Sequence, residues 1–131
     1  MKTITHAEFG ELLKAQGVER EHYAFKCPIC GTIQSATSLV RAGAGPDVSD
    51  DRVWKSEGFS CVGRFTGHKR VKDEAPGQGC DWTLGGFFQV HTHEVEYKGK
   101  THPIFEPASA AEAQALREHH LNTPFPPIEK A

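Results

Sequence analysis

The residues with the clearest chemistry are two cysteines that stand two residues apart in Phe25-Lys26-Cys27-Pro28-Ile29-Cys30-Gly31. A tight turn through such a pair carries both thiolates to one side, where each can approach zinc at about 2.3 Å with near-tetrahedral angles. Pro28 presets φ at the start of the turn, and Gly31 allows a positive φ at its exit. Two thiolates are half of a structural site. The sequence therefore predicts that the two remaining cysteines, Cys61 and Cys80, complete it.

Other uses of this cysteine pair have to be weighed against zinc. A thioredoxin-like redox pair usually follows a strand and opens a helix, whereas Gly31 to Gln34 is typical of a strand. Disulfides are a third possibility, but nothing marks the chain as secreted. His68 is an alternative fourth ligand, seven residues after Cys61. We favour Cys80, because the glycine before it suits a knuckle-like turn, and four thiolates leave no open position for catalysis.

A second candidate cluster consists of His91 and His93, with His102 beyond a turn. Alternate residues of a strand share a face. If Lys98-Gly99 is a two-residue turn, His91 pairs with Glu106 and the three histidines share that face. They could then hold a second, catalytic metal with an open position, as in a metal-dependent hydrolase. A three-residue turn would move His102 to the other face, and exposed strand histidines without a role are common.

A basic stretch follows the third cysteine. Its Lys and Arg residues could contact phosphates of a nucleic acid, and they are Arg64, Lys69, Arg70 and Lys72. Asp73 and Glu74 dilute the charge, and the whole chain carries a formal net charge of -2. The molecule as a whole therefore does not have the electrostatics of a nucleic-acid binder.

The motifs of several enzyme classes are missing from the sequence. There is no Gly-x-Ser-x-Gly elbow, no phosphate-binding Gly-Lys-Ser/Thr loop and no His-Glu-x-x-His pair. The case for an enzyme rests on the histidine cluster alone. We therefore expect a binding protein and not an enzyme.

Local patterns predict the order of the elements. Two helices open with capping boxes, Thr5 with Glu8 and Ser109 with Glu112, and run over about 5–16 and 109–120. Ser35 should cap a short helix that ends at Gly43 or Gly45. The remaining expected elements are a strand at 22–25, a strand at 32–34, a helical turn within 47–55, a strand at 58–65, a basic loop at 66–79, a hairpin at 87–105 and an extended tail at 122–128.

The length of 131 residues fits one domain. With 13 glycines and 8 prolines the chain has a modest hydrophobic core, which a metal site would stabilise. The predicted fold is α+β, a small zinc-ribbon-like domain with a C-terminal β-hairpin and flanking helices. Its zinc core covers about 22–86 and its hairpin about 87–106, and a C-terminal helix and extended tail occupy 108–131. One structural Zn²⁺ is expected. The absence of a signal peptide or membrane span favours the cytoplasm.

Three stretches resemble a family of small bacteriophage and prophage proteins with no established activity. They are Phe25-Lys26-Cys27-Pro28-Ile29-Cys30-Gly31-Thr32, Gly58-Phe59-Ser60-Cys61-Val62-Gly63-Arg64 and Gly79-Cys80-Asp81-Trp82-Thr83-Leu84-Gly85-Gly86-Phe87-Phe88. The resemblance implies a phage or prophage origin and an accessory role in the bacterial cytoplasm. It carries no catalytic residues. The expected function is that of a zinc-stabilised protein that binds, and inhibits or redirects, a host macromolecule. A host protein is preferred to nucleic acid as the partner.

Overall fold

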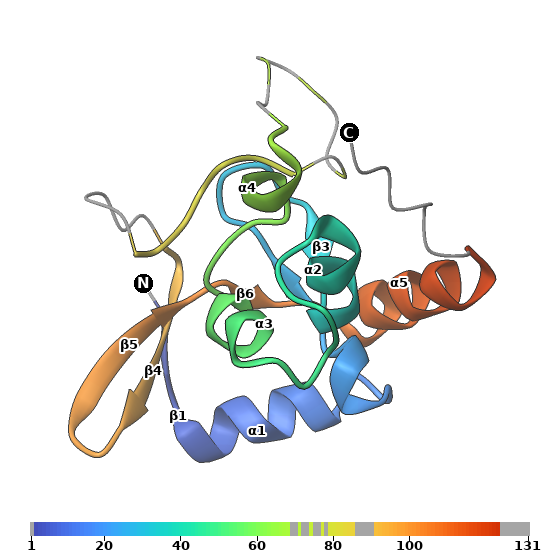
Figure 1. Cartoon of the computed structure of the whole chain (residues 1–131). Helices are drawn as coiled ribbons and strands as arrows, with labels where there is room; N and C mark the ends of the chain where they lie inside the picture. Colours follow the sequence, from blue (N-terminus) through green and yellow to red (C-terminus); the bar gives the residue numbers. More distant parts are fainter. Residues whose placement is uncertain are drawn as a thin grey trace.

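The computed structural model describes residues 2–68, 71, 74, 77, 79–85 and 91–123, and these form a small mixed α+β domain (Figure 1). One sheet has the strand order β1-β4-β5 and the other the order β3-β2-β6. The strands are β1 (Lys2–Thr5), β2 (Phe25–Lys26), β3 (Ile33–Gln34), β4 (His93–Tyr97), β5 (Lys100–Ile104) and β6 (Glu106–Pro107). The helices are α1 (His6–Lys14), the 3-10 turn η1 (Arg20–His22), α2 (Ala36–Ala42), α3 (Asp51–Ser56), α4 (Gly63–Thr66) and α5 (Ala110–Asn122).

The helix starts follow from their capping residues. Thr5, Ser35 and Ser109 each accept a hydrogen bond from the backbone N–H three residues later, and the side chain at that position accepts one in return. These caps confirm the predicted starts of α1, α2 and α5. The predicted end of α2 at Gly43 is also confirmed, since Gly43 has a φ of 97°.

The β4–β5 hairpin has the predicted two-residue turn. Lys98 and Gly99 have φ of 52° and 76°, and the pairing of Val95 with His102 follows. The hairpin ends earlier than predicted, because β5 stops at Ile104. The chain then passes through the buried Phe105 into β6, which pairs with β2 in the other sheet. The predicted strand segment at 86–90 lies outside the described residues.

Two expected strands are wrong in part. The segment 58–65 is not a strand, since Ser60 forms a single bridge with Thr83 and the chain turns into α4 at Gly63. The predicted strand at 22–25 begins only at Phe25, because the preceding residues form η1. Two strands were not predicted. One is β6, and the other is β1, which pairs in parallel with β4, about ninety residues away in the sequence.

The buried side chains form three neighbouring groups. The central group contains the four cysteines together with Phe25, Leu84 and Phe105. A second group joins α2 to α3 through Leu39 and Val53, and a third lies under α5 around Ala113. The cysteines thus lie in the centre of the core and not at its edge.

Candidate metal centre

The side chains of Cys27, Cys30, Cys61 and Cys80 come together, with their sulfur atoms all within 4.8 Å of one another. The Sγ atoms of Cys27 and Cys80 are 3.7 Å apart, and those of Cys30 and Cys61 are 3.6 Å apart. Four thiolates about 2.3 Å from a tetrahedral zinc would be separated by about 3.8 Å. A disulfide would need about 2.05 Å. The spacing therefore fits a metal-binding tetrathiolate, and none of the four residues is more than 4% exposed.

The first two cysteines lie at the tip of the β2–β3 hairpin. The N–H of Gly31 donates to the carbonyl of Cys27 at 2.9 Å, and the N–H of Cys27 donates to the carbonyl of Thr32 at 3.0 Å. Gly31 has a φ of 74°, as the sequence predicted. These contacts close the turn that aims both sulfurs inward.

The other two cysteines come from segments that run antiparallel across the core. The N–H of Cys61 donates to the carbonyl of Trp82, and the N–H of Leu84 donates to that of Phe59, both at 2.9 Å. Next to these bonds Gly63 packs against the backbone of Cys80 so closely that an added Cβ would overlap its N and O atoms. A residue with a side chain at position 63 would push Cys80 away from the cluster.

The buried side chain of Gln34 holds the Cys61 segment from both sides. Its Nε2 donates to the carbonyl of Ser60 at 2.7 Å, and its Oε1 accepts from the N–H of Val62 at 2.9 Å. The amide thus bridges the two residues that flank Cys61, much as a paired strand would. The sequence analysis did not identify Gln34.

Thr32 has the corresponding role for Cys80. Its hydroxyl accepts from the N–H groups of Gly77 and Gly79, at 3.1 and 3.2 Å, and lies 3.1 Å from the sulfur of Cys30. Thr32 and Gln34 are two residues apart, which places both on one face of the strand. The spacing of Thr32 and Gln34 was the one signal for this role in the sequence, but the same spacing is equally typical of a polar strand face exposed to solvent.

Comparison with known proteins assigns the chain to a family. A family model, described as VVA0879-like, matches residues 5–108, which include all four cysteines. The chain belongs to the VVA0879-like family. No curated protein and no solved structure matches.

Three of the four thiols in this VVA0879-like domain have a shifted acidity. The pKa of Cys61 falls to about 5, because the Cys27 thiol donates to its sulfur and the N–H groups of Gly63 and Cys80 point toward it. That hydrogen bond and burial raise the pKa of Cys27, and burial raises the pKa of Cys80 to about 12. A bound cation would supply the positive charge that ionises Cys27 and Cys80.

His91, His93 and His102 are not brought together into a group of potential metal ligands in the described part of the chain. Within the described ranges, the four cysteines are the one group of three or more potential ligands that lie close enough to share an ion. The Nε2 of His91 lies 3.5 Å from the Oε2 of Glu94, and the Nδ1 of His93 lies 2.8 Å from the hydroxyl of Thr92. His102 is exposed, and the expected pairing of His91 with Glu106 is not made, because Glu106 belongs to β6.

His68 and Arg64 are not part of the cysteine cluster. The Nε2 of His68 lies 2.8 Å from a carboxylate oxygen of Glu74, and the fourth residue of the cluster is Cys80. Arg64 is exposed, and its Nη1 lies 3.3 Å from the carbonyl of Asp81. The other three basic residues of the predicted phosphate-contacting set, Lys69, Arg70 and Lys72, lie outside the described residues.

Proposed function

We propose that the protein is a zinc-stabilised binding module, related in its metal core to zinc ribbons, that contacts a protein of a bacterial host on behalf of a phage or prophage. The metal centre supports a structural role, since four buried thiolates would close the coordination sphere of zinc. A metal with a closed coordination sphere has no site for a substrate, so the protein would act on other molecules through its surface. We accordingly propose binding and not catalysis.

The observation that carries the proposal is a groove of about 580 Å³ between β1 and α1. Strand β1 is an edge strand, because within the described part of the chain it pairs only with β4. Ile4 forms part of the floor, and Ala7, Leu12 and Ala15 form an apolar wall on α1. Leu12 is 42% exposed, so its side chain is open to a partner. An open strand edge beside an apolar wall suits an extended peptide that adds to the sheet.

The charges of the groove indicate which peptide would fit. Glu8 and Glu11 line it, with Lys2 at its end. The Thr5 amide donates to the Glu8 carboxylate and lowers its pKa, so Glu8 stays ionised. The proposed partner therefore presents an extended segment with an apolar residue for the wall and a basic residue for the two glutamates.

The test is affinity capture from a nuclease-treated bacterial lysate with three versions of the chain. Leu12→Asp should reduce the recovered partner at least about tenfold, because it places a charge in the apolar wall. The matched control is Leu121→Asp, on an α5 residue that is 61% exposed and outside the groove. Equal recovery by Leu12→Asp and the wild type would contradict this binding surface, and recovery of nucleic acid alone from untreated lysate would contradict a protein partner.

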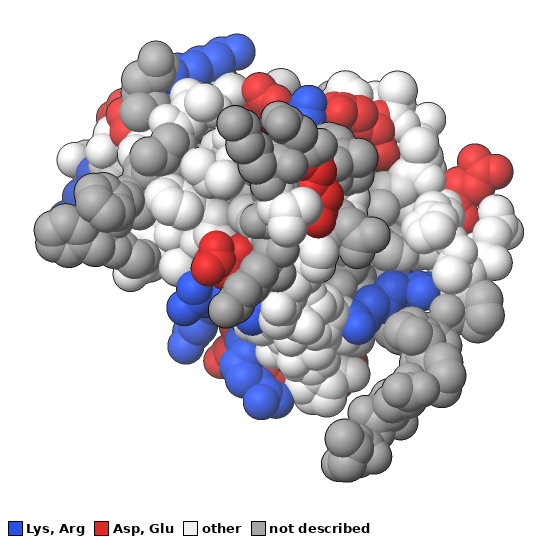
Figure 2. All heavy atoms as spheres, turned by 90° about the horizontal axis from the view of Figure 1, so that it is seen from above, with Lys and Arg blue, Asp and Glu red and all other residues white. Residues whose placement is uncertain are grey.

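The nucleic-acid alternative draws less support from the described surface. On the face shown in Figure 2, Lys and Arg are interspersed with Asp and Glu and do not gather into one basic patch.

Among the described helices, none is long and apolar enough to span a membrane.

A further inference from the structure

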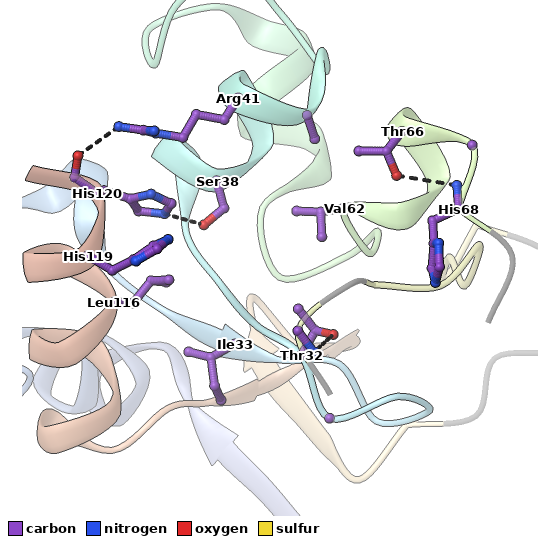
Figure 3. Close-up of a pocket in the computed structure, with 14 residues that line it drawn as sticks. Thr32, Ile33, Ser38, Arg41, Val62, Thr66, His68, Leu116, His119 and His120 are labelled. Carbon is purple, nitrogen blue, oxygen red and sulfur yellow. Dashed lines mark hydrogen bonds between the residues drawn. The ribbon is translucent and has the colours of Figure 1, made fainter. Parts of the chain in front are cut away.

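A second and larger cleft, of about 1000 Å³, lies on another side of the molecule from the β1–α1 groove. Its walls come from α2, α4 and α5, and Gly31 and Thr32 of the cysteine turn contribute to its base (Figure 3). In the close-up, Arg41, His119 and His120 lie on one side and His68 on the other. The cleft is therefore a separate feature that depends on the metal-binding turn for part of its shape.

The lining of this cleft is rich in hydrogen-bond donors. The described residues that line it include Arg41 and three histidines, and they include no aspartate or glutamate. That is notable in a chain with more acidic than basic residues. Arg41 is the charged residue among the described lining residues, and a cation in a cleft without acidic side chains attracts an anion.

The C-terminal end of α5 would by itself repel an anion, because its last carbonyls carry partial negative charge. Arg41 offsets this effect at close range, since its Nη2 donates to the carbonyl of His120 at 2.7 Å. The ring of His120 is held in turn by Ser38, whose hydroxyl lies 2.8 Å from its Nε2. His119, which immediately precedes His120 on α5, is exposed and lines the cleft.

The same cleft also has an apolar part. Ile33, Val62 and Leu116 line it, and Figure 3 shows Ile33 and Val62 between the two polar sides and Leu116 beside His119. A ligand that fits both features carries an anionic group at one end and a flat or apolar body at the other. The volume is in the range of pockets that hold molecules of nucleotide size.

We propose that this cleft binds a small phosphomonoester with an apolar or aromatic body, of the size of a nucleoside monophosphate. The phosphate contacts Arg41 and His119, and the body lies over Ile33, Val62 and Leu116. This site is independent of the peptide groove.

Titration calorimetry on the full, metal-loaded chain at low salt tests the proposal, with AMP as the probe. Adenosine serves as the uncharged match and inorganic phosphate as the match without a body. We expect AMP to bind at least about tenfold more tightly than either, since AMP alone offers both a charged group for the hydrogen bonds and a body that is buried on binding. Equal affinity for adenosine, or no detectable heat with AMP, would overturn the proposal. Equal affinity for inorganic phosphate would overturn the apolar part of it.

Two variants connect the binding to the cleft. His119→Gln changes an exposed side chain, so the fold should persist, and AMP affinity should fall about fivefold or more. Arg52→Gln removes an exposed arginine of α3 that pairs with Asp50 outside the cleft, and AMP affinity should not change. An unchanged affinity in His119→Gln, or an equal loss in Arg52→Gln, would place the AMP site elsewhere.

Discussion

At the scale of single residues, the geometry of the cysteine cluster depends on side chains outside the cluster. Gln34 and Thr32 fix the backbone on either side of Cys61 and before Cys80. Such partners of metal ligands typically affect metal affinity by about 10- to 100-fold. Their contribution is positional, because they hold the third and fourth sulfurs where the first two already lie.

We predict that Gln34→Leu lowers both stability and metal affinity. The substitution leaves the carbonyl of Ser60 and the N–H of Val62 buried without their partner, which costs about 2–4 kcal/mol. Chelator competition should show metal affinity reduced at least about tenfold.

Gln114→Leu is the matched control for this prediction. Gln114 is an exposed glutamine that donates to the carbonyl of Gln16, away from the cysteines. It should change the unfolding free energy by less than about 1 kcal/mol and leave metal affinity unchanged. A Gln34→Leu protein that competes with chelator as well as the wild type would refute the positioning role.

The sequence predicted the ligands but not their supports, and the reason is physical. Cysteine pairs have few uses in a small chain, so Cys27 and Cys30 point to zinc by type and spacing alone. Thr32 and Gln34 are polar residues on a two-residue strand, and nothing local distinguishes the buried face from the exposed one. The face that contains Thr32 and Gln34 is buried only because the segment around Cys61, far along the chain, packs against it.

At the scale of elements, α5 is fastened to the rest of the molecule by polar contacts at both ends. Near its start, Gln16 donates to the carbonyl of Ala108, and near its end His120 contacts Ser38. Arg117 also pairs with Glu19 on the surface. Of these contacts, the one between His120 and Ser38 contains a partly buried group that can titrate below neutral pH.

We predict that protonation of His120 destabilises the protein below neutral pH. Burial, together with the nearby positive groups Arg41, His119 and His22, lowers the pKa of His120 to about 4, whereas an unfolded histidine has a pKa near 6.5. The unfolded chain therefore binds more protons between these values, and stability falls as pH drops from about 6.5 toward 4. The loss should be roughly 1–3 kcal/mol, reduced from the full shift by solvent screening.

The measurement is the unfolding free energy at several pH values for the wild type and for His120→Phe. The difference between the two proteins isolates His120, because acid affects the cysteines of both alike. His102→Phe, on an exposed histidine of β5, should keep the wild-type slope. A His120→Phe protein with the wild-type slope would contradict the prediction.

The elements that the sequence predicted are those that local residues specify. Capping boxes placed the starts of α1 and α5, and the Lys98-Gly99 pair placed the hairpin turn. Strand β1 was missed because Lys2–Thr5 contains one apolar residue, Ile4, and its pairing with β4 depends on distant chain. The wrong strand at 58–65 has a similar cause: the approach of Cys61 to the cluster bends a segment whose composition favours a strand.

At the scale of the whole molecule, the cysteine cluster joins segments that would otherwise share little. It connects the β2–β3 turn to the two antiparallel segments around Cys61 and Cys80, and it forms part of the central apolar group. The chain has 37% hydrophobic residues, so its core is small, and metal binding should supply much of its folding free energy. The β1–α1 groove and the larger cleft both border this cluster, since Phe9 and Leu13 of α1 pack against it and Gly31 and Thr32 line the cleft.

The most direct test of the metal-centred account is cobalt substitution with a count of bound ions. We predict a single cobalt ion per chain, with the intense sulfur-to-cobalt absorption and visible bands of a tetrahedral tetrathiolate. The spectrum should persist when His91 and His93 are both changed to Ala. It should be lost in Cys61→Ala, which should also fail to fold. A wild-type chain that binds no metal and contains disulfides, or a Cys61→Ala chain that stays folded with the cobalt spectrum intact, would contradict the account.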